Sequence, residues 1–159
     1  MNLLLKLIYQ SKLYLFCVRH RKQINSGKHL SVRRGFFVKL GKKASITIGN
    51  NCFFNNDCSL NVMEQIVVGD DCLFGENVKL YDHDHLHEQG VLFREQGFVS
   101  APIIIGNNCW IGANVTILKG VKIGDNVVVA AGTVVTQDVP ENTIIYQKRN
   151  TVYKINSRH

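Results

Sequence analysis

The chain has 159 residues, of which 45% are hydrophobic and 19% charged, and this length predicts one globular domain with a core of its own. The formal net charge of +7 is unevenly distributed: residues 1–43 hold eleven Lys and Arg and no acid, whereas residues 44–159 hold eight Lys and Arg and twelve Asp and Glu. No base-reading motif accompanies the basic segment, so the sequence argues against a nucleic-acid partner.

Residues 1–34 form a basic segment that we expect to be helical. Its apolar stretch, residues 1–18, is interrupted by Lys6 and Lys12, which argues against a transmembrane span, and no small-residue cleavage site follows, which argues against a signal peptide. Five apolar residues share one helical face: Leu3, Leu4, Leu7, Ile8 and Leu15. Two interpretations remain open. The helix packs on the end of the main domain or on a neighbouring subunit, or it lies on a membrane whose anionic lipids attract the basic run 19–22.

Residues 35–142 follow a period of six. An aliphatic or aromatic residue recurs at this spacing, with one slip of two residues and one long interruption: Ile48, Phe54, Leu60, Val68, Phe74, Leu80, Ile105, Ile111, Ile117, Ile123, Val129 and Val135. This period fits neither a helix nor a flat alternating strand. It predicts a parallel β-helix, in which three six-residue units make one triangular coil and neighbouring coils pair as parallel strands.

The ends of the six-residue units are suited to tight turns. Glycine follows many of the periodic residues, as at Gly49 and Gly106, and we expect the corner to need a positive φ there. An Asn or Asp pair comes next, as at Asn50-Asn51, and such residues also accept left-handed backbone.

Four of the five cysteines occupy the small position that should point inward: Cys52, Cys58, Cys72 and Cys109. At such positions cysteine acts as a small hydrophobic residue. No CxxC spacing is present, which argues against a structural zinc site. We therefore expect reduced thiols and a cytoplasmic protein.

The repeat is interrupted once, and residues 86–98 are predicted to form a loop that leaves the solenoid. Tyr81-Asp82-His83-Asp84-His85 precedes this loop, and His87 follows two residues later. Aspartates beside histidines can fix an imidazole tautomer and raise its basicity, which suits proton transfer. Two other interpretations are a solvated polar loop entrance and a metal site formed by the three alternating histidines, for which no distant fourth ligand is evident.

The run from residue 102 to 140, PIIIGNNCWIGANVTILKGVKIGDNVVVAAGTVVTQDVP, resembles the hexapeptide-repeat acyltransferases, and among them bacterial O-acetyltransferases of sugars, nodulation factors, capsule and O-antigen. The resemblance extends over about residues 35–142. It implies an all-β, left-handed parallel β-helix with an N-terminal helix and one long extruded loop. It also implies an acetyl-coenzyme A donor, a homotrimer and active sites between adjacent subunits.

The resemblance also implies roles for individual residues. The family's catalytic histidine ends the six-residue unit that enters the loop, which makes His85 the expected general base and His83 the alternative. Asn55 matches a family asparagine that contacts the acceptor, and we place Asp82 and Trp110 among the acceptor-binding residues with it.

Coenzyme binding is expected at six positions: Trp110, Ala113, Ala131, Thr136, Lys148 and Arg149. The indole can flank the thioester arm, and the two alanines leave room for pantetheine beside the coil backbone. The Gly-x-Pro-Ala segment that usually ends the family's solenoid is replaced here by residues 145–150, IYQKRN, within the predicted tail 143–159. Lys148 and Arg149 could still pair with coenzyme phosphates.

Together these features predict an enzyme that transfers acetyl from acetyl-coenzyme A directly to a carbohydrate hydroxyl of a cell-surface polysaccharide or its precursor, without a metal. Two alternatives stay open: an amino-sugar N-acetyltransferase on the same fold, and a zinc-dependent protein of the carbonic anhydrase-like β-helix type.

Overall fold

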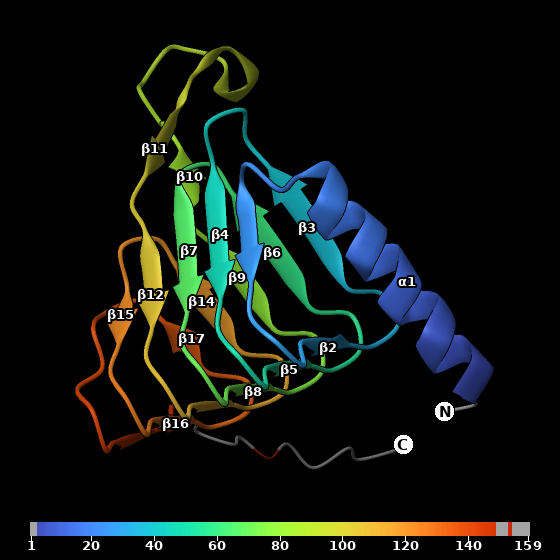
Figure 1. Ribbon diagram of the computed structural model, residues 1–159. Helices are drawn as coiled ribbons and strands as arrows, with labels where there is room; N and C mark the ends of the chain where they lie inside the picture. Colours follow the sequence, from blue (N-terminus) through green and yellow to red (C-terminus); the bar gives the residue numbers. More distant parts are fainter. Residues whose placement is uncertain (1–2, 149–152, 154–159) are drawn as a thin grey trace, which may run out of the picture.

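The computed structural model describes residues 3–148 and residue 153. The chain forms a three-sided solenoid of short parallel strands, and helix α1 (Leu3–Arg19) lies across one end (Figure 1). The β-helix predicted from the period of six is therefore confirmed.

Each side of the solenoid is one parallel sheet, built from strands of successive coils. The first sheet contains β1 (Ile24–Ser26), β4 (Ser45–Ile48), β7 (Gln65–Val68), β12 (Ile103–Ile105) and β15 (Lys122–Ile123). The second contains β2 (Ser31–Val32), β5 (Phe53–Phe54), β8 (Leu73–Phe74), β13 (Trp110–Ile111), β16 (Val128–Val129) and β18 (Ile144–Ile145). The third contains β3 (Phe37–Leu40), β6 (Ser59–Val62), β9 (Lys79–Tyr81), β14 (Thr116–Leu118) and β17 (Val134–Val135).

The core is a set of columns in which equivalent residues of successive coils stack. The twelve periodic residues predicted to point inward are all buried, with at most 4% of their surface exposed. In one column the rings of Phe54 and Phe74 stack in parallel with centroids 4.2 Å apart. Burying each such side chain contributes about 1.5–3 kcal/mol, so the columns supply most of the stabilisation of the solenoid.

At the corners with an Asn or Asp pair, the left-handed backbone falls on the pair and not on the preceding glycine, whereas Gly35, Gly120 and Gly132 have positive φ at other corners. Positive φ values near 55° fall on the second residue of each pair: Asn51, Asp71, Asn108 and Asn126. The expectation of positive φ at Gly49 and Gly106 was wrong. A Cβ on Gly49 would lie 2.6 Å from the carbonyl carbon of Gly69 in the next coil, so glycine is required there because the coils approach closely.

The solenoid extends beyond residues 35–142 at both ends. β1 pairs with β4 and β2 with β5, so the first coil begins at Ile24. β18 pairs with β16, so strand pairing continues to Ile145. Part of the expected N-terminal segment and part of the expected tail therefore belong to the sheets.

Helix α1 covers the open end of the first coil (Figure 1). Leu13 and Cys17 point toward the solenoid and pack against its core. Among the described residues, no helix has the length and apolar character needed to cross a membrane.

All five cysteines are free thiols. The four at inward positions are at most 1% exposed, as their place in the repeat predicts. Each of these four Sγ atoms donates to a glycine carbonyl of the next coil at 3.1 or 3.2 Å. Burial raises the pKa of the Cys58 thiol, which keeps this donor protonated.

Candidate active site

The solenoid is interrupted by a two-stranded hairpin. β10 (His83–His85) leaves the third sheet after β9 and pairs antiparallel with β11 (Phe98–Ser100). Between them the chain forms an exposed loop with a short 3₁₀ helix, η1 (Phe93–Glu95), which Figure 1 shows projecting from the solenoid. The predicted loop 86–98 therefore lies inside a longer excursion, and both candidate bases sit on one arm of the hairpin.

Asp82 anchors the start of this hairpin to the solenoid. Its side chain is fully buried, and its carboxylate accepts hydrogen bonds from the backbone N–H groups of Met63, Glu64 and Gln65 at 2.7–3.1 Å. Met63 and Glu64 form the turn between β6 and β7, where the repeat slips by two residues, and Gln65 begins β7. The enclosed carboxylate holds this segment against the hairpin, and the role of Asp82 in acceptor binding stays a prediction.

His83 completes this network. Its Nδ1 lies 3.0 Å from Oδ1 of Asp82, and only 12% of its side chain is exposed. An ionised carboxylate only accepts, so Nδ1 of His83 carries the hydrogen and Nε2 is the ring atom left to accept. The ring also meets Phe98 edge-on, with centroids 5.4 Å apart.

His85 is the more accessible of the two candidate bases. Its side chain is exposed, and its ring lies 4.4 Å from the Phe98 ring, centroid to centroid. Among the described residues no hydrogen bond to the His85 ring is found. Both ring nitrogens are therefore available to a hydroxyl that approaches the hairpin.

Asp84 holds the hairpin through a different contact. Its Oδ2 lies 2.7 Å from Nζ of Lys119, which follows β14 one coil further on. Successive side chains of a strand point to opposite faces, so Asp84 contacts the solenoid while His83 and His85 contact Phe98. Sequence reasoning missed Lys119 and Phe98. The repeat contained a signal for the first, because Leu118 pairs with Tyr81 and so brings Lys119 beside the start of the hairpin.

The predicted coenzyme and acceptor residues gather along another edge, between the second and third sheets. Trp110 is 58% exposed on the outer surface of the second sheet, between Leu73 and Val128. Ala113 and Ala131 follow at the corner, where the carbonyl of Ala113 accepts the N–H of Gly132 at 2.8 Å.

The remaining predicted residues are distributed more widely. Asn55 lies at the same edge in an earlier coil, half-buried, and its Oδ1 accepts the N–H of Asn56 at 2.9 Å. Thr136 is exposed just after β17, at the edge between the third and first sheets, and Lys148 is exposed after β18. Arg149 lies outside the described residues. Within the described part of the chain, no group of three His, Cys, Asp or Glu is placed to hold a metal ion.

Comparison with known proteins agrees with the solenoid fold. The family model for the hexapeptide repeat of succinyl-transferase matches residues 102–137. Galactoside O-acetyltransferase of Escherichia coli K12 is 34% identical over 146 residues, which cover 83% of this chain and 70% of that enzyme. This chain belongs to the hexapeptide-repeat acetyltransferase family. A second family member, galactoside O-acetyltransferase of Lactococcus lactis, is 30% identical over 125 residues; the match covers 76% of this chain and 57% of that enzyme, less than two thirds of its length.

Solved structures of hexapeptide-repeat acetyltransferases have the same fold. A Vibrio cholerae family member complexed with acetyl-coenzyme A superposes with a TM-score of 0.71, at 32% identity, over 85% of this chain and 71% of that chain. A galactoside acetyltransferase in complex with coenzyme A gives a TM-score of 0.70 at 33% identity, over 78% of this chain and 61% of that chain.

Proposed function

We propose that this acetyltransferase moves an acetyl group from acetyl-coenzyme A to a hydroxyl of a carbohydrate, in a cell-surface polysaccharide or its precursor. The observation that carries the proposal is the hairpin, which presents the exposed His85 at the one interruption of the solenoid. The names of the relatives support a sugar acceptor, since two of them are galactoside O-acetyltransferases. The structures solved with acetyl-coenzyme A or coenzyme A support the donor.

In the proposed reaction, His85 is the general base. A ring nitrogen takes the proton of the acceptor hydroxyl as the oxygen attacks the thioester carbonyl. The C–S bond then breaks, and the coenzyme leaves as a thiol after it receives that proton. Imidazole is well suited to accept and return a proton near neutral pH. His83, whose Nδ1 meets Asp82, is the alternative base; its low exposure favours a positioning role.

The donor would lie along the edge that contains Trp110, Ala113 and Ala131. Small side chains at this corner leave the coil backbone accessible to a narrow pantetheine arm, and the exposed indole offers it an apolar surface. Backbone N–H groups at such an edge are candidates to stabilise the developing oxyanion. Thr136 and Lys148, both exposed, remain predicted contacts to the rest of the coenzyme.

The separation of the two edges supports a homotrimer. His85 lies near the edge between the third and first sheets, whereas Asn55 and Trp110 lie at the edge between the second and third. A neighbouring copy could bring the missing half to each site. The outer face of the second sheet also carries an apolar ladder of paired residues, suited to subunit contact: Phe53, Leu73, Trp110, Val128 and Ile144.

Free thiols in the core support a reducing compartment, and we propose that the enzyme works in the cytoplasm. Separation of cell extracts into soluble, membrane and periplasmic fractions, followed by immunodetection, tests this assignment. Recovery in the periplasmic fraction would contradict it.

The central test compares His85→Ala with His83→Ala in a coenzyme A release assay against a panel of sugar acceptors. We expect His85→Ala to lower kcat by roughly 10²–10⁴-fold while the oligomeric mass is retained. Full activity in this variant rejects His85 as the base. Hydroxyl and amine acceptors are assayed side by side, and transfer only to the amine would point to an amino-sugar N-acetyltransferase.

A complementation experiment tests the shared site. Asn55→Ala and His85→Ala subunits are each expected to be nearly inactive. When they are dissociated and reassembled together, about a quarter of the sites in a ring of shared sites combine two intact halves and regain activity. No recovery in verified mixed oligomers would place each site within one subunit.

A further inference from the structure

Helix α1 is apolar on two opposite faces. Tyr9, Leu13 and Cys17 recur every four residues and point toward the solenoid. Ile8 and Leu15, seven residues apart, lie on the other side, where they are 38% and 65% exposed. Only one apolar face is needed to cover the end of the solenoid, so the outer face needs another explanation.

The outer face carries large exposed apolar side chains, with the exposed Ser11 and Arg19 among them. Val18 extends the stripe of Ile8 and Leu15 by three residues and is 50% exposed, and Tyr14 lies beside them with 69% exposed. A surface helix of a globular protein normally presents polar residues on this side. An amphipathic tyrosine with large aliphatic residues is typical of a helix that lies in the interface of a bilayer.

The surroundings of α1 are strongly basic. Among the Lys and Arg side chains described between residues 19 and 43, all except that of Arg33 are exposed. The ion pairs found among the described residues all lie beyond residue 81, so none of them neutralises this end of the solenoid. The far end carries exposed charges of both signs, with Asp138 and Glu141 near Lys122 and Lys148. A negatively charged surface would therefore orient the molecule with α1 toward it.

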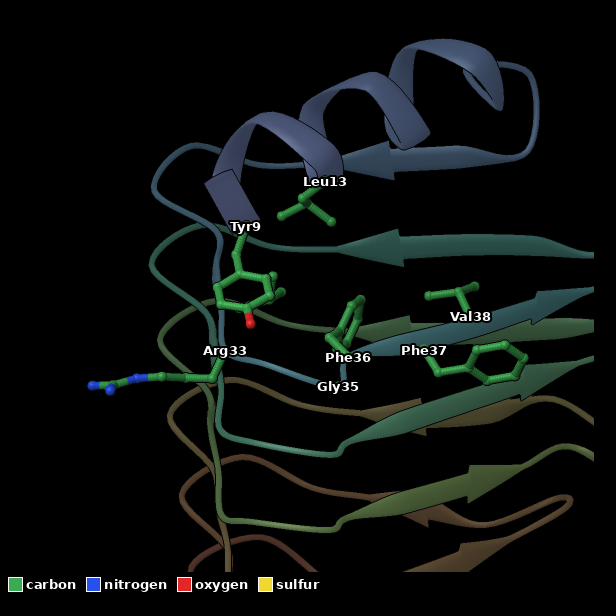
Figure 2. A pocket seen from close by; sticks show the side chains of 8 residues that line it. Tyr9, Leu13, Arg33, Gly35, Phe36, Phe37 and Val38 are labelled. Carbon is green, nitrogen blue, oxygen red and sulfur yellow. The ribbon is translucent and has the colours of Figure 1, made fainter. Parts of the chain in front are cut away.

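An apolar cavity lies on the inner side of the helix, lined by Tyr9 and Leu13. It has a volume of about 440 Å³ and opens between α1 and the first coil. Figure 2 shows Tyr9 and Leu13 pointing from the helix toward Phe36, while the side chain of Arg33 points away from the cavity. The helix thus rests on the coil with apolar space beside it, in which an acyl chain or a lipid-facing side chain could be accommodated.

We propose that the outer face of α1 and the basic first coil dock on a membrane surface rich in anionic phospholipid. The apolar stripe would enter the interface, and the exposed Lys and Arg side chains would meet the lipid headgroups. Charge favours this occupant over a second copy of the chain, because two copies joined through this end would bring like charges together. The proposal is independent of the acetyl transfer chemistry.

The first test measures binding of the full chain to sucrose-loaded vesicles by co-sedimentation. Vesicles of phosphatidylcholine alone are compared with vesicles that also contain phosphatidylglycerol, at low and at high salt. We expect binding to the anionic vesicles at low salt, weakened about tenfold or more by high salt or by the neutral lipid. Equal binding to both lipids, or no binding to either, overturns the proposal.

The second test separates the apolar and the basic contributions. We expect Leu15→Gln with Val18→Gln to weaken vesicle binding on the order of tenfold, because two aliphatic side chains no longer enter the interface. Arg21→Gln with Lys22→Gln should weaken it by a similar factor at low salt only. Leu92→Gln with Lys122→Gln removes one exposed apolar and one basic side chain elsewhere and should leave binding unchanged.

Circular dichroism and gel filtration accompany each variant, so that loss of folding is distinguished from loss of binding. If Leu15→Gln with Val18→Gln lowers the oligomeric mass and leaves vesicle binding intact, a second copy of the chain covers α1 and the membrane proposal is rejected.

Discussion

The Oδ1 atom of Asp82 lies 3.0 Å from Nδ1 of His83, at the point where the chain leaves the third sheet. The same carboxylate accepts three backbone hydrogen bonds from the turn that precedes β7 and from the first residue of β7. One buried side chain therefore joins the scaffold, the slip in its repeat and the arm that carries the candidate base.

We expect Asp82→Asn to destabilise the fold and to reduce activity together. The amide keeps the size of the carboxylate but replaces one accepting oxygen by an NH₂ group and removes the charge, which weakens the hydrogen bonds from the backbone N–H groups at a cost of about 1–3 kcal/mol. Urea unfolding and kcat measure the two effects. Asp71→Asn, at an exposed corner, is the matched control and should change stability by less than about 0.5 kcal/mol. Equal urea concentrations at the midpoint of unfolding for both variants would argue against the role assigned to Asp82.

Trp110 is the only tryptophan of the chain, so its fluorescence reports directly on its surroundings. If the coenzyme arm lies along its edge, titration with coenzyme A should shift or quench the emission. Trp110→Ala should raise the KM for acetyl-coenzyme A by about tenfold, the effect of losing roughly 1.4 kcal/mol of binding. Leu73→Ala, one coil away on the outer face of the second sheet, is the control: a similar rise in KM there would indicate a general change in that face. Unchanged emission at saturating coenzyme A would place the donor elsewhere.

Close approach of the coils predicts a large cost for adding a methyl group at some glycines. A Cβ on Gly112 would lie 2.6 Å from the backbone nitrogen of Ala131, whereas one on Gly97 would meet only Leu86, at 3.8 Å. We therefore expect Gly112→Ala to cost more than about 2 kcal/mol of unfolding free energy and Gly97→Ala less than about 0.5 kcal/mol. Thermal or urea unfolding of the pair measures the difference. Similar stabilities would show that the coils can separate easily.

The core thiols should be unreactive while the chain is folded. A thiol-specific chromogenic reagent should detect at most Cys17 in the native protein and all five cysteines after unfolding in denaturant. The pKa of Cys58 is raised by burial, so above the ordinary thiol value, about 8.5, the unfolded chain releases this proton first. This contribution to stability is present below that pH and is lost as the pH rises further. Rapid native labelling of all five thiols would contradict the buried columns.

The sequence predicted the core because a solenoid repeats its geometry. A residue such as Ile111 must point inward when Ile105 and Ile117 do, so one correct register fixes the others. The left-handed Asn and Asp residues were predicted correctly, but the glycines before them were predicted for the wrong reason, since the clash that excludes side chains at Gly49 involves a coil twenty residues away. The first coil was missed because its inward residues Ile24 and Val32 are eight residues apart, which breaks the period of six.

The candidate site, like the fold, was predicted only in part. His85 was predicted from its position where the repeat stops together with the family resemblance, and its role as the base stays a prediction. Its neighbours were not identifiable, because the contact of Lys119 with Asp84 and the place of Phe98 depend on how the hairpin folds back. The enclosure of Asp82 was hidden for the same reason: its partners are backbone groups seventeen to nineteen residues earlier.

The hairpin also has a consequence for how such a protein can change. Ile66 and Ile103 are direct neighbours in the first sheet, so the coils before and after the excursion meet as they would without it. A single inserted residue within a strand would turn its inward side chains to the outside. Inside the hairpin tip the same insertion would alter only an exposed segment. The hairpin can therefore change in length and sequence while the scaffold that supports it stays fixed.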